Sequence, residues 1–126
     1  MITGVGIDMV QIKRMEHWLD SSCLLERYFH PDELAASMSR NKAESLAARF
    51  AAKEAFGKAL GTGLTDIKLK DIMVNNTSGG KPEIKLFGTA LNAFSLSGAD
   101  KIHISLTHEK ENAVAIVIME KVNNYG

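Results

Sequence analysis

One stretch constrains the fold of this chain more than any other, and it lies at residues 42–60. Its sequence, KAESLAARFAAKEAFGKAL, is rich in alanine, leucine, lysine and glutamate, which have high helix propensities. It runs into Gly61-Thr62-Gly63, which is typical of the left-handed cap and turn that end a helix. The sequence therefore predicts one long helix, and the rest of the chain must pack around it.

Most of the remaining apolar residues follow the patterns of β-strands. The last run, AVAIVIM, is nearly continuous and is typical of a strand buried on both faces. Glycine-rich and polar segments separate the strands and favour hairpin connections. The expected strands are residues 2–10, 67–74, 83–87, 101–106 and 113–119.

Shorter helices complete the expected fold. Residues 11–19 and 88–96 have helical spacing of apolar residues, and Pro31 followed by two acids is typical of a helix start. The predicted class is α+β, with a small antiparallel sheet packed on one long helix and shorter helices. A length of 126 residues suits a single domain, residues 1–126. The polar tail at 122–126 is expected to be frayed.

The charge balance narrows the possible partners. Lysine plus arginine total 15 and aspartate plus glutamate total 15, so the net charge is zero. A strongly basic nucleic-acid binder is therefore disfavoured, and any anion site must come from local clustering of positive charge.

No run approaches the ~20 apolar residues of a membrane span, and no secretory signal pattern opens the chain, so the expected location is the cytoplasm. The single cysteine, Cys23, excludes an internal disulfide and is expected to be buried.

Two carboxylates are candidates for a metal site. Asp8 interrupts an apolar strand, where a bare carboxylate is costly, and Glu54 lies on the long helix. If they converge, they could hold magnesium, which shares its shell with waters and phosphates. Arg49, Lys53 and Lys58 could then neutralise those phosphates. On the residues alone, Asp8 could equally cap a turn or pair with a lysine, and Glu54 could form an ordinary surface ion pair with Lys58.

Other chemical patterns in the chain are weaker. The Gly79-Gly80-Lys81-Pro82 run is typical of a hairpin turn, and it lacks the ending and the following helix of a P-loop. His108 follows a strand end and could donate to phosphate or act as an acid or base. Ser105 and His108 lie three apart on a strand and so face opposite sides, which disfavours a hydrolase triad. The other histidines lack the spacing of a zinc site.

Several motifs in order carry a resemblance to a known family. They are Gly6-Ile7-Asp8, then RFAAKEAF at 49–56 followed by KALGTG at 58–63, then Gly80-Lys81-Pro82, and finally Ser105-Leu106-Thr107-His108. From about residue 4 to residue 119 the chain resembles the holo-acyl-carrier-protein synthase family of 4′-phosphopantetheinyl transferases. The central motif at 49–63 is highly specific for this family. The outer motifs are weak individually, but their order and spacing together are specific.

The resemblance implies a reaction in fatty acid biosynthesis. The family moves the phosphopantetheine arm of coenzyme A onto a serine of apo-acyl carrier protein and releases adenosine 3′,5′-bisphosphate. By this likeness Asp8 and Glu54 bind magnesium, and Lys58 approaches the pyrophosphate. The expected base is Glu54 acting through a water, or a water on the metal, with His108 as the alternative. Phosphoryl transfer mainly needs such positioning and charge neutralisation.

The likeness also implies the substrate site and the assembly. The family forms trimers with each active site between two subunits, so a homotrimer is expected. The carrier is an acidic helical protein. The residues expected to line the coenzyme A site are Gly61, Gly80, Lys81, Pro82 and His108, with Arg49, Lys53 and Lys58 on its phosphates.

Docking of the carrier is expected on the helix that Lys13 and Arg14 open, with Met15 and Trp18 as apolar contacts. On the residues alone, Met15 and Trp18 could equally belong to the core. The chain departs from the family pattern here, because residues 17–22 lack the extra basic side chains of some members. Gln11 and Thr107 also replace residues common in the family, an acidic residue and a serine respectively.

Two other functions remain open from the sequence. The first is a non-catalytic module of the same fold that binds coenzyme A or a carrier protein; intact Asp8, Glu54 and Lys58 disfavour it. The second is a single-strand nucleic-acid binder, which would need aromatic residues among basic ones on its strands. The expected strands carry one aromatic residue, Phe87, at an end. The sequence therefore favours the enzyme.

Overall fold

The computed structural model describes residues 1–38 and 41–123. The long helix α4 has the predicted bounds and ends at Gly61, whose φ of 84° is left-handed. The elements in chain order are β1 (Ile2–Gln11), α1 (Ile12–Trp18), α2 (Ser22–Tyr28), α3 (Pro31–Ala36), α4 (Lys42–Leu60), the 3-10 turn η1 (Leu69–Asp71), β2 (Ile72–Asn76), β3 (Pro82–Leu86), α5 (Gly88–Ser97), β4 (Lys101–His108) and β5 (Asn112–Glu120).

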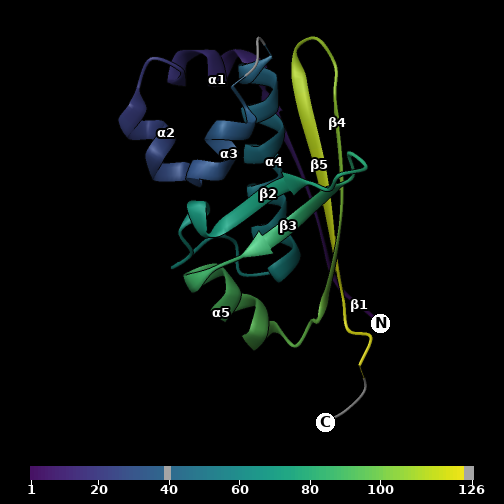
Figure 1. Cartoon of the computed structure of the whole chain (residues 1–126). Coiled ribbons are helices and arrows are strands. Elements are labelled where there is room, and N and C mark those ends of the chain that lie inside the picture. The colour runs from purple at the N-terminus through teal and green to yellow at the C-terminus, as the bar shows by residue number, and fades with distance from the viewer. Residues whose placement is uncertain (39–40, 124–126) are drawn as a thin grey trace.

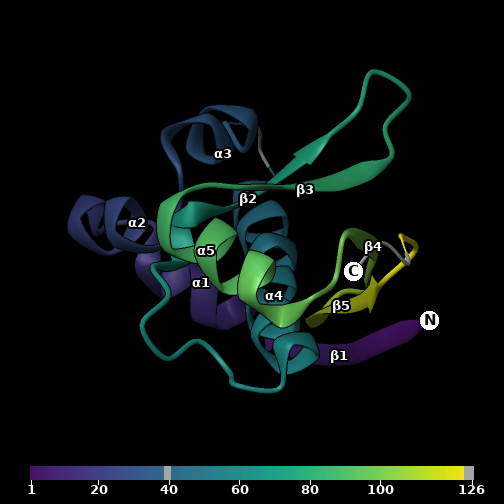
Figure 2. The same cartoon turned by 90° about the horizontal axis from the view of Figure 1, so that it is seen from below.

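The arrangement confirms the α+β prediction. Helix α4 packs across a three-stranded antiparallel sheet with the order β1-β5-β4. Helices α1, α2 and α3 gather at the N-terminal half of α4, and α5 lies toward its other end (Figure 1). Strands β2 and β3 form a separate two-stranded hairpin, and Figure 2 shows α4 between this hairpin and β1.

The strand expected at 67–74 is shorter than predicted and starts at Ile72. Asp71 explains the difference, because its Oδ2 accepts hydrogen bonds from the Thr89 N–H at 2.9 Å and the Thr89 hydroxyl at 2.6 Å. The Thr89 hydroxyl in turn accepts the Lys68 N–H at 2.9 Å. These bonds turn the segment toward the start of α5, and it forms η1 before β2 begins.

Strand β1 crosses α4 at very short range because it carries glycine where the two meet. A Cβ added to Gly4 would lie 1.8 Å from the carbonyl oxygen of Ala59, and one on Gly6 would lie 1.9 Å from that of Ala55. The helix backbone cannot move aside cheaply, so only glycine fits these positions. Asp8 follows Gly6 on the same face of β1, and the contact therefore directs its side chain toward α4.

The sheet face opposite α4 is apolar and has no cover from the described residues of the chain. We call it the outer face; it consists of Val5, Ile7, Met9, Val114, Ile116 and Ile118. Val5, Ile7 and Met9 are 56%, 58% and 64% exposed. The other face of β5 is buried against α4. Burial of β5 on both faces, as its sequence predicts, is therefore not found within one chain.

One smaller expectation is wrong. Cys23 is exposed, because Leu25 lies about 200° further around α2 and takes the inward position. The tail is tied at its start, since the N–H groups of Val122 and Asn123 donate to the Asp100 carboxylate at 2.8 and 2.9 Å. The rest of the expected frayed tail, 124–126, lies outside the described residues. Within the described part of the chain, no helix is long and apolar enough to cross a membrane.

Candidate active site

Asp8 and Lys58 meet where β1 crosses α4. The Lys58 Nζ donates to Asp8 Oδ1 at 3.0 Å and to the Ile7 carbonyl oxygen at 3.0 Å. The Asp8 side chain is 19% exposed and that of Lys58 is 54% exposed. The lysine supplies the partner that a carboxylate on an apolar strand requires. Because the pair lies at the surface, a ligand can reach it.

Glu54 lies one turn before Lys58 and shares its face of α4. Partial burial and the nearby Asp8 carboxylate raise the pKa of Glu54, while Arg14 and Lys58 oppose the rise. The negative charges of the Asp8 and Glu54 carboxylates therefore repel each other. A divalent cation bound between them would relieve this repulsion.

Asp8 and Glu54 together offer two carboxylates to a metal ion. Among the described residues, no group of three or more histidine, cysteine, aspartate or glutamate side chains could hold a metal. Magnesium is commonly bound by one or two carboxylates, with waters and substrate phosphates completing its shell. Asp8 and Glu54 provide such a pair.

Arg14 enters the same site from α1. Its guanidinium carbon lies 5.0 Å from the ring centre of Phe50 and 5.4 Å from that of Trp18, within cation–π range. Trp18 in turn stacks on Tyr28, with ring centres 5.3 Å apart. Phe50 precedes Glu54 by one helical turn, so the aromatic side chains hold Arg14 beside the carboxylates.

The other residues expected to bind the carrier differ in their exposure. Lys13 is exposed and Trp18 is half-buried. Met15 is fully buried, because α1 packs on α4 through Ile12 and Met15, which are three residues apart on one face. The expectation that Met15 contacts the carrier is therefore wrong.

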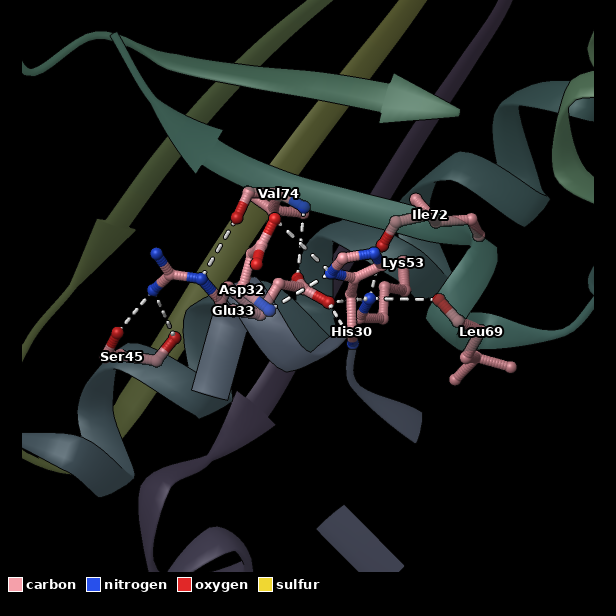
Figure 3. Close-up of polar contacts among 9 residues, drawn as sticks. His30, Asp32, Glu33, Ser45, Lys53, Leu69, Ile72 and Val74 are labelled. Carbon is pink, nitrogen blue, oxygen red and sulfur yellow. Dashed lines mark hydrogen bonds and ion pairs between the residues drawn. The ribbon is translucent and has the colours of Figure 1, made fainter. Parts of the chain in front are cut away.

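Lys53, expected to bind phosphate, is buried in the centre of the fold. Its ammonium donates to Glu33 Oε1 at 2.7 Å, to the Leu69 carbonyl oxygen at 2.9 Å and to the Ile72 carbonyl oxygen (Figure 3). These bonds use all three donors of the ammonium, and the side chain is 0% exposed. Burial lowers the pKa of Lys53 to about 8, although Glu33 opposes the shift. A phosphate role for Lys53 is excluded.

Glu33 is the buried ion-pair partner of Lys53. Nothing in the sequence indicates this role, apart from the position of Glu33 in the first turn of a helix. Its Oε1 also accepts the His30 N–H at 2.9 Å, as part of a capping box at the start of α3. Its Oε2 accepts the Val74 N–H at 3.0 Å. Glu33 and Lys53 therefore tie α3, α4 and β2 together.

Arg49 and His108 line a pocket of about 240 Å³ between α4, β2 and the end of β4. Arg49 is 7% exposed, and its Nε donates to the Val74 carbonyl oxygen at 3.1 Å. It also bonds to the carbonyl and hydroxyl oxygens of Ser45. A guanidinium has five donors, so these contacts do not exhaust it.

The other residues expected to bind coenzyme A lie elsewhere. Lys81 and Pro82 line a pocket of about 550 Å³ between β3 and β4. Gly80 has a φ of 85° in the turn between β2 and β3, and Gly61 caps α4. Neither pocket is lined by Asp8, Glu54 or Lys58.

One chain assembles only part of the expected site. Asp8, Glu54, Lys58 and Arg14 are brought together, whereas His108 lies on the opposite edge of the sheet. Strand β5 lies between β1 and β4. The backbones at Asp8 and His108 are therefore at least two strand spacings apart, or ~9.5 Å. Arg49 lines the first of the two pockets and Lys81 and Pro82 line the second. Gly61 and Gly80 line neither of them.

Comparison with known proteins identifies the class of protein to which the chain belongs. Residues 4–117 match the 4′-phosphopantetheinyl transferase superfamily, and the chain belongs to that superfamily. The resemblance inferred from the motifs is confirmed.

The individual relatives are holo-[acyl-carrier-protein] synthases. The one from Treponema denticola is 57% identical over 122 residues, covering 95% of this chain and 99% of its own. Among solved structures, that from Neisseria meningitidis has a TM-score of 0.87 and 31% identity, and covers 96% of this chain and 100% of its own. The Bacillus anthracis structure, in complex with coenzyme A (3′,5′-ADP), has a TM-score of 0.79 and 35% identity, covering 96% and 98%.

Proposed function

We propose that this protein transfers the 4′-phosphopantetheine arm of coenzyme A to a serine hydroxyl of apo-acyl carrier protein and releases adenosine 3′,5′-bisphosphate. The observation that carries the proposal is the meeting of Asp8, Glu54 and Lys58 at one accessible place. Phosphoryl transfer needs such positioned charge more than covalent chemistry by the protein. The names of the relatives and the coenzyme A complex support the same reaction.

Asp8 and Glu54 are the residues that would hold magnesium. When bound, the ion would neutralise charge on the pyrophosphate of coenzyme A. Lys58 binds and orients the same group, because Asp8 and the Ile7 carbonyl use two of its three donors and the third can serve a phosphate oxygen.

Glu54 is also the proposed general base. A bridging water would carry the serine proton to its carboxylate. His108 is the second candidate. Because it lies on the far edge of the sheet, His108 would have to come from another copy of the chain.

The proposed assembly is a homotrimer with each active site between two subunits. The outer face supports it, since large exposed apolar patches usually mark interfaces. The division of the site supports it too, because Lys81, Pro82 and His108 lie apart from Asp8 within one chain. A neighbouring copy could bring these residues to the carboxylate pair.

We expect Ile116→Glu to disrupt this assembly. Ile116 is the central outer-face residue of β5, between Ile7 on β1 and Ser105 on β4, and a charge there cannot be desolvated cheaply. Sedimentation should change from trimer to monomer, with loss of turnover. Val122→Glu, at an exposed apolar residue outside the outer face, is the matched control and should remain trimeric. A fully active monomeric wild type would contradict the shared site.

The carrier is proposed to dock on α1 through Lys13, Arg14 and Trp18. We expect Arg14→Glu to raise the KM for the carrier about tenfold, because reversing a charge opposite an acidic partner converts attraction into repulsion. Steady-state kinetics with each substrate varied in turn checks this, and an unchanged carrier KM would argue against α1 as the docking face.

A non-catalytic binding module of the same fold is the alternative, and product formation separates the two. The enzyme should release adenosine 3′,5′-bisphosphate from coenzyme A only when apo-carrier and magnesium are both present. A binding module would leave coenzyme A intact, and chromatography of the nucleotides distinguishes these outcomes.

A further inference from the structure

A basic groove of about 440 Å³ lies between α2 and the segment that follows α4. Its cations, Arg27, Lys68 and Lys70, are exposed, and none of its lining residues is acidic. Asp66 and Asp71 flank the two lysines in the chain, but neither lines the groove, and the Asp71 carboxylate is hydrogen-bonded to Thr89. The lining itself is therefore positively charged. The full lining is Arg27, Tyr28, Ile67, Lys68, Leu69 and Lys70.

Burial of the neighbouring apolar residues keeps the two lysines of the groove at the surface. On the segment after α4, Ile67 is buried and Leu69 is half-buried. The Leu69 carbonyl oxygen also accepts a hydrogen bond from the buried Lys53. The alternate residues Lys68 and Lys70 therefore remain at the surface. Figure 1 shows the turn that leads into β2 beside the end of α2, so the two sides of the groove belong to packed elements.

The groove is continuous with the proposed docking face on α1. Tyr28 lines the groove and stacks on Trp18, with ring centres 5.3 Å apart and planes inclined by 26°. Arg14 lies over the same Trp18 ring at 5.4 Å. A partner that touches Arg14 beside the active site can therefore extend along Trp18 and Tyr28 to the basic groove.

We propose that this groove is a second contact for the acidic carrier protein, an inference that rests on the proposed function. Helix α1 carries Lys13 and Arg14 but also Glu16, and Asp20 follows it, so the first contact has little net positive charge. The groove supplies the missing charge and offers Tyr28 and Leu69 as partly apolar surface. A helix with acidic side chains beside an apolar one matches this chemistry.

The test is charge reversal of the two lysines, Lys68→Glu with Lys70→Glu. The carrier KM should rise about tenfold or more at low ionic strength, while the coenzyme A KM and the turnover number at saturating carrier stay unchanged. Added salt should raise the carrier KM of the wild type more steeply than that of the variant. The matched control, Lys85→Glu with Lys121→Glu, makes the same change of net charge at exposed positions away from the groove. It should retain the wild-type KM, and melting temperatures confirm that both variants fold.

Each other result has a definite meaning. A raised coenzyme A KM with an unchanged carrier KM would assign the groove to the nucleotide and overturn the inference. Unchanged values for both substrates would overturn it as well, while leaving the proposed function intact. Absence of transfer by the wild-type protein would instead refute the proposed function, and this inference with it.

Discussion

Replacing Glu54 with glutamine is expected to reduce transfer of phosphopantetheine about a thousandfold or more. The change keeps the shape of the side chain but removes one of two carboxylates that would hold magnesium, and with it the proposed base. A loss of about 4 kcal/mol of charge stabilisation in the transition state corresponds to a factor of about a thousand. Turnover measured across a magnesium titration should show that excess metal fails to restore the rate.

Loss of folding cannot explain that result, because Glu54→Gln should be at least as stable as the wild type. Burial and Asp8 raise the pKa of Glu54, so the folded state disfavours its charged form, and a neutral amide avoids that cost. Glu111→Gln, at an exposed residue in the β4–β5 turn, is the matched control and should keep full activity. Transfer at the wild-type rate by Glu54→Gln would refute the role of the carboxylate pair.

Replacing Lys53 with methionine is expected to destabilise the fold by about 3–5 kcal/mol, the usual cost of leaving one partner of a buried ion pair alone. The Glu33 carboxylate would lose its cation, and the carbonyl oxygens of Leu69 and Ile72 would lose a donor. Urea unfolding measures the loss directly, and the melting temperature should fall by about 10 °C or more.

Two comparisons make this prediction specific. The double variant Glu33→Gln with Lys53→Met should recover part of the stability, because no isolated charge then remains in the interior. Lys58→Met should do the opposite of Lys53→Met, with little effect on stability and a large effect on transfer, since Lys58 is 54% exposed beside Asp8. A stable Lys53→Met variant with a raised coenzyme A KM would restore the phosphate role that the structure excludes.

The sequence predicted the helical frame well because its signals are local. The bounds of α4 follow from an uninterrupted run of helix-forming residues and a terminal glycine. The place of Asp8 opposite Glu54 could also be anticipated, since the glycines of β1 permit the close helix contact that brings them together. The bounds of α4 depend only on residues that are close in the chain. The approach of Asp8 to Glu54 depends on one contact, that between β1 and α4.

The directions of the lysines on α4 could not be predicted in the same way. Lys53 and Lys58 look alike in the sequence, but one faces α3 and β2 while the other faces β1. Only the tertiary position of Glu33 and Ile72 decides which is buried. Similarly, the apolar run of β5 cannot distinguish a second layer within the chain from a neighbouring subunit. If the coenzyme A site is shared between subunits, as proposed, the sequence of one chain cannot show which residues meet there.

The most direct measurement is the mass of apo-acyl carrier protein after incubation with this protein, coenzyme A and magnesium. The carrier should gain the mass of one phosphopantetheine group on a serine, and a chelator added at the start should prevent the gain. An unchanged carrier mass with active protein and magnesium present would contradict the proposed transfer. A gain that persists in the chelator would contradict the role of magnesium at Asp8 and Glu54.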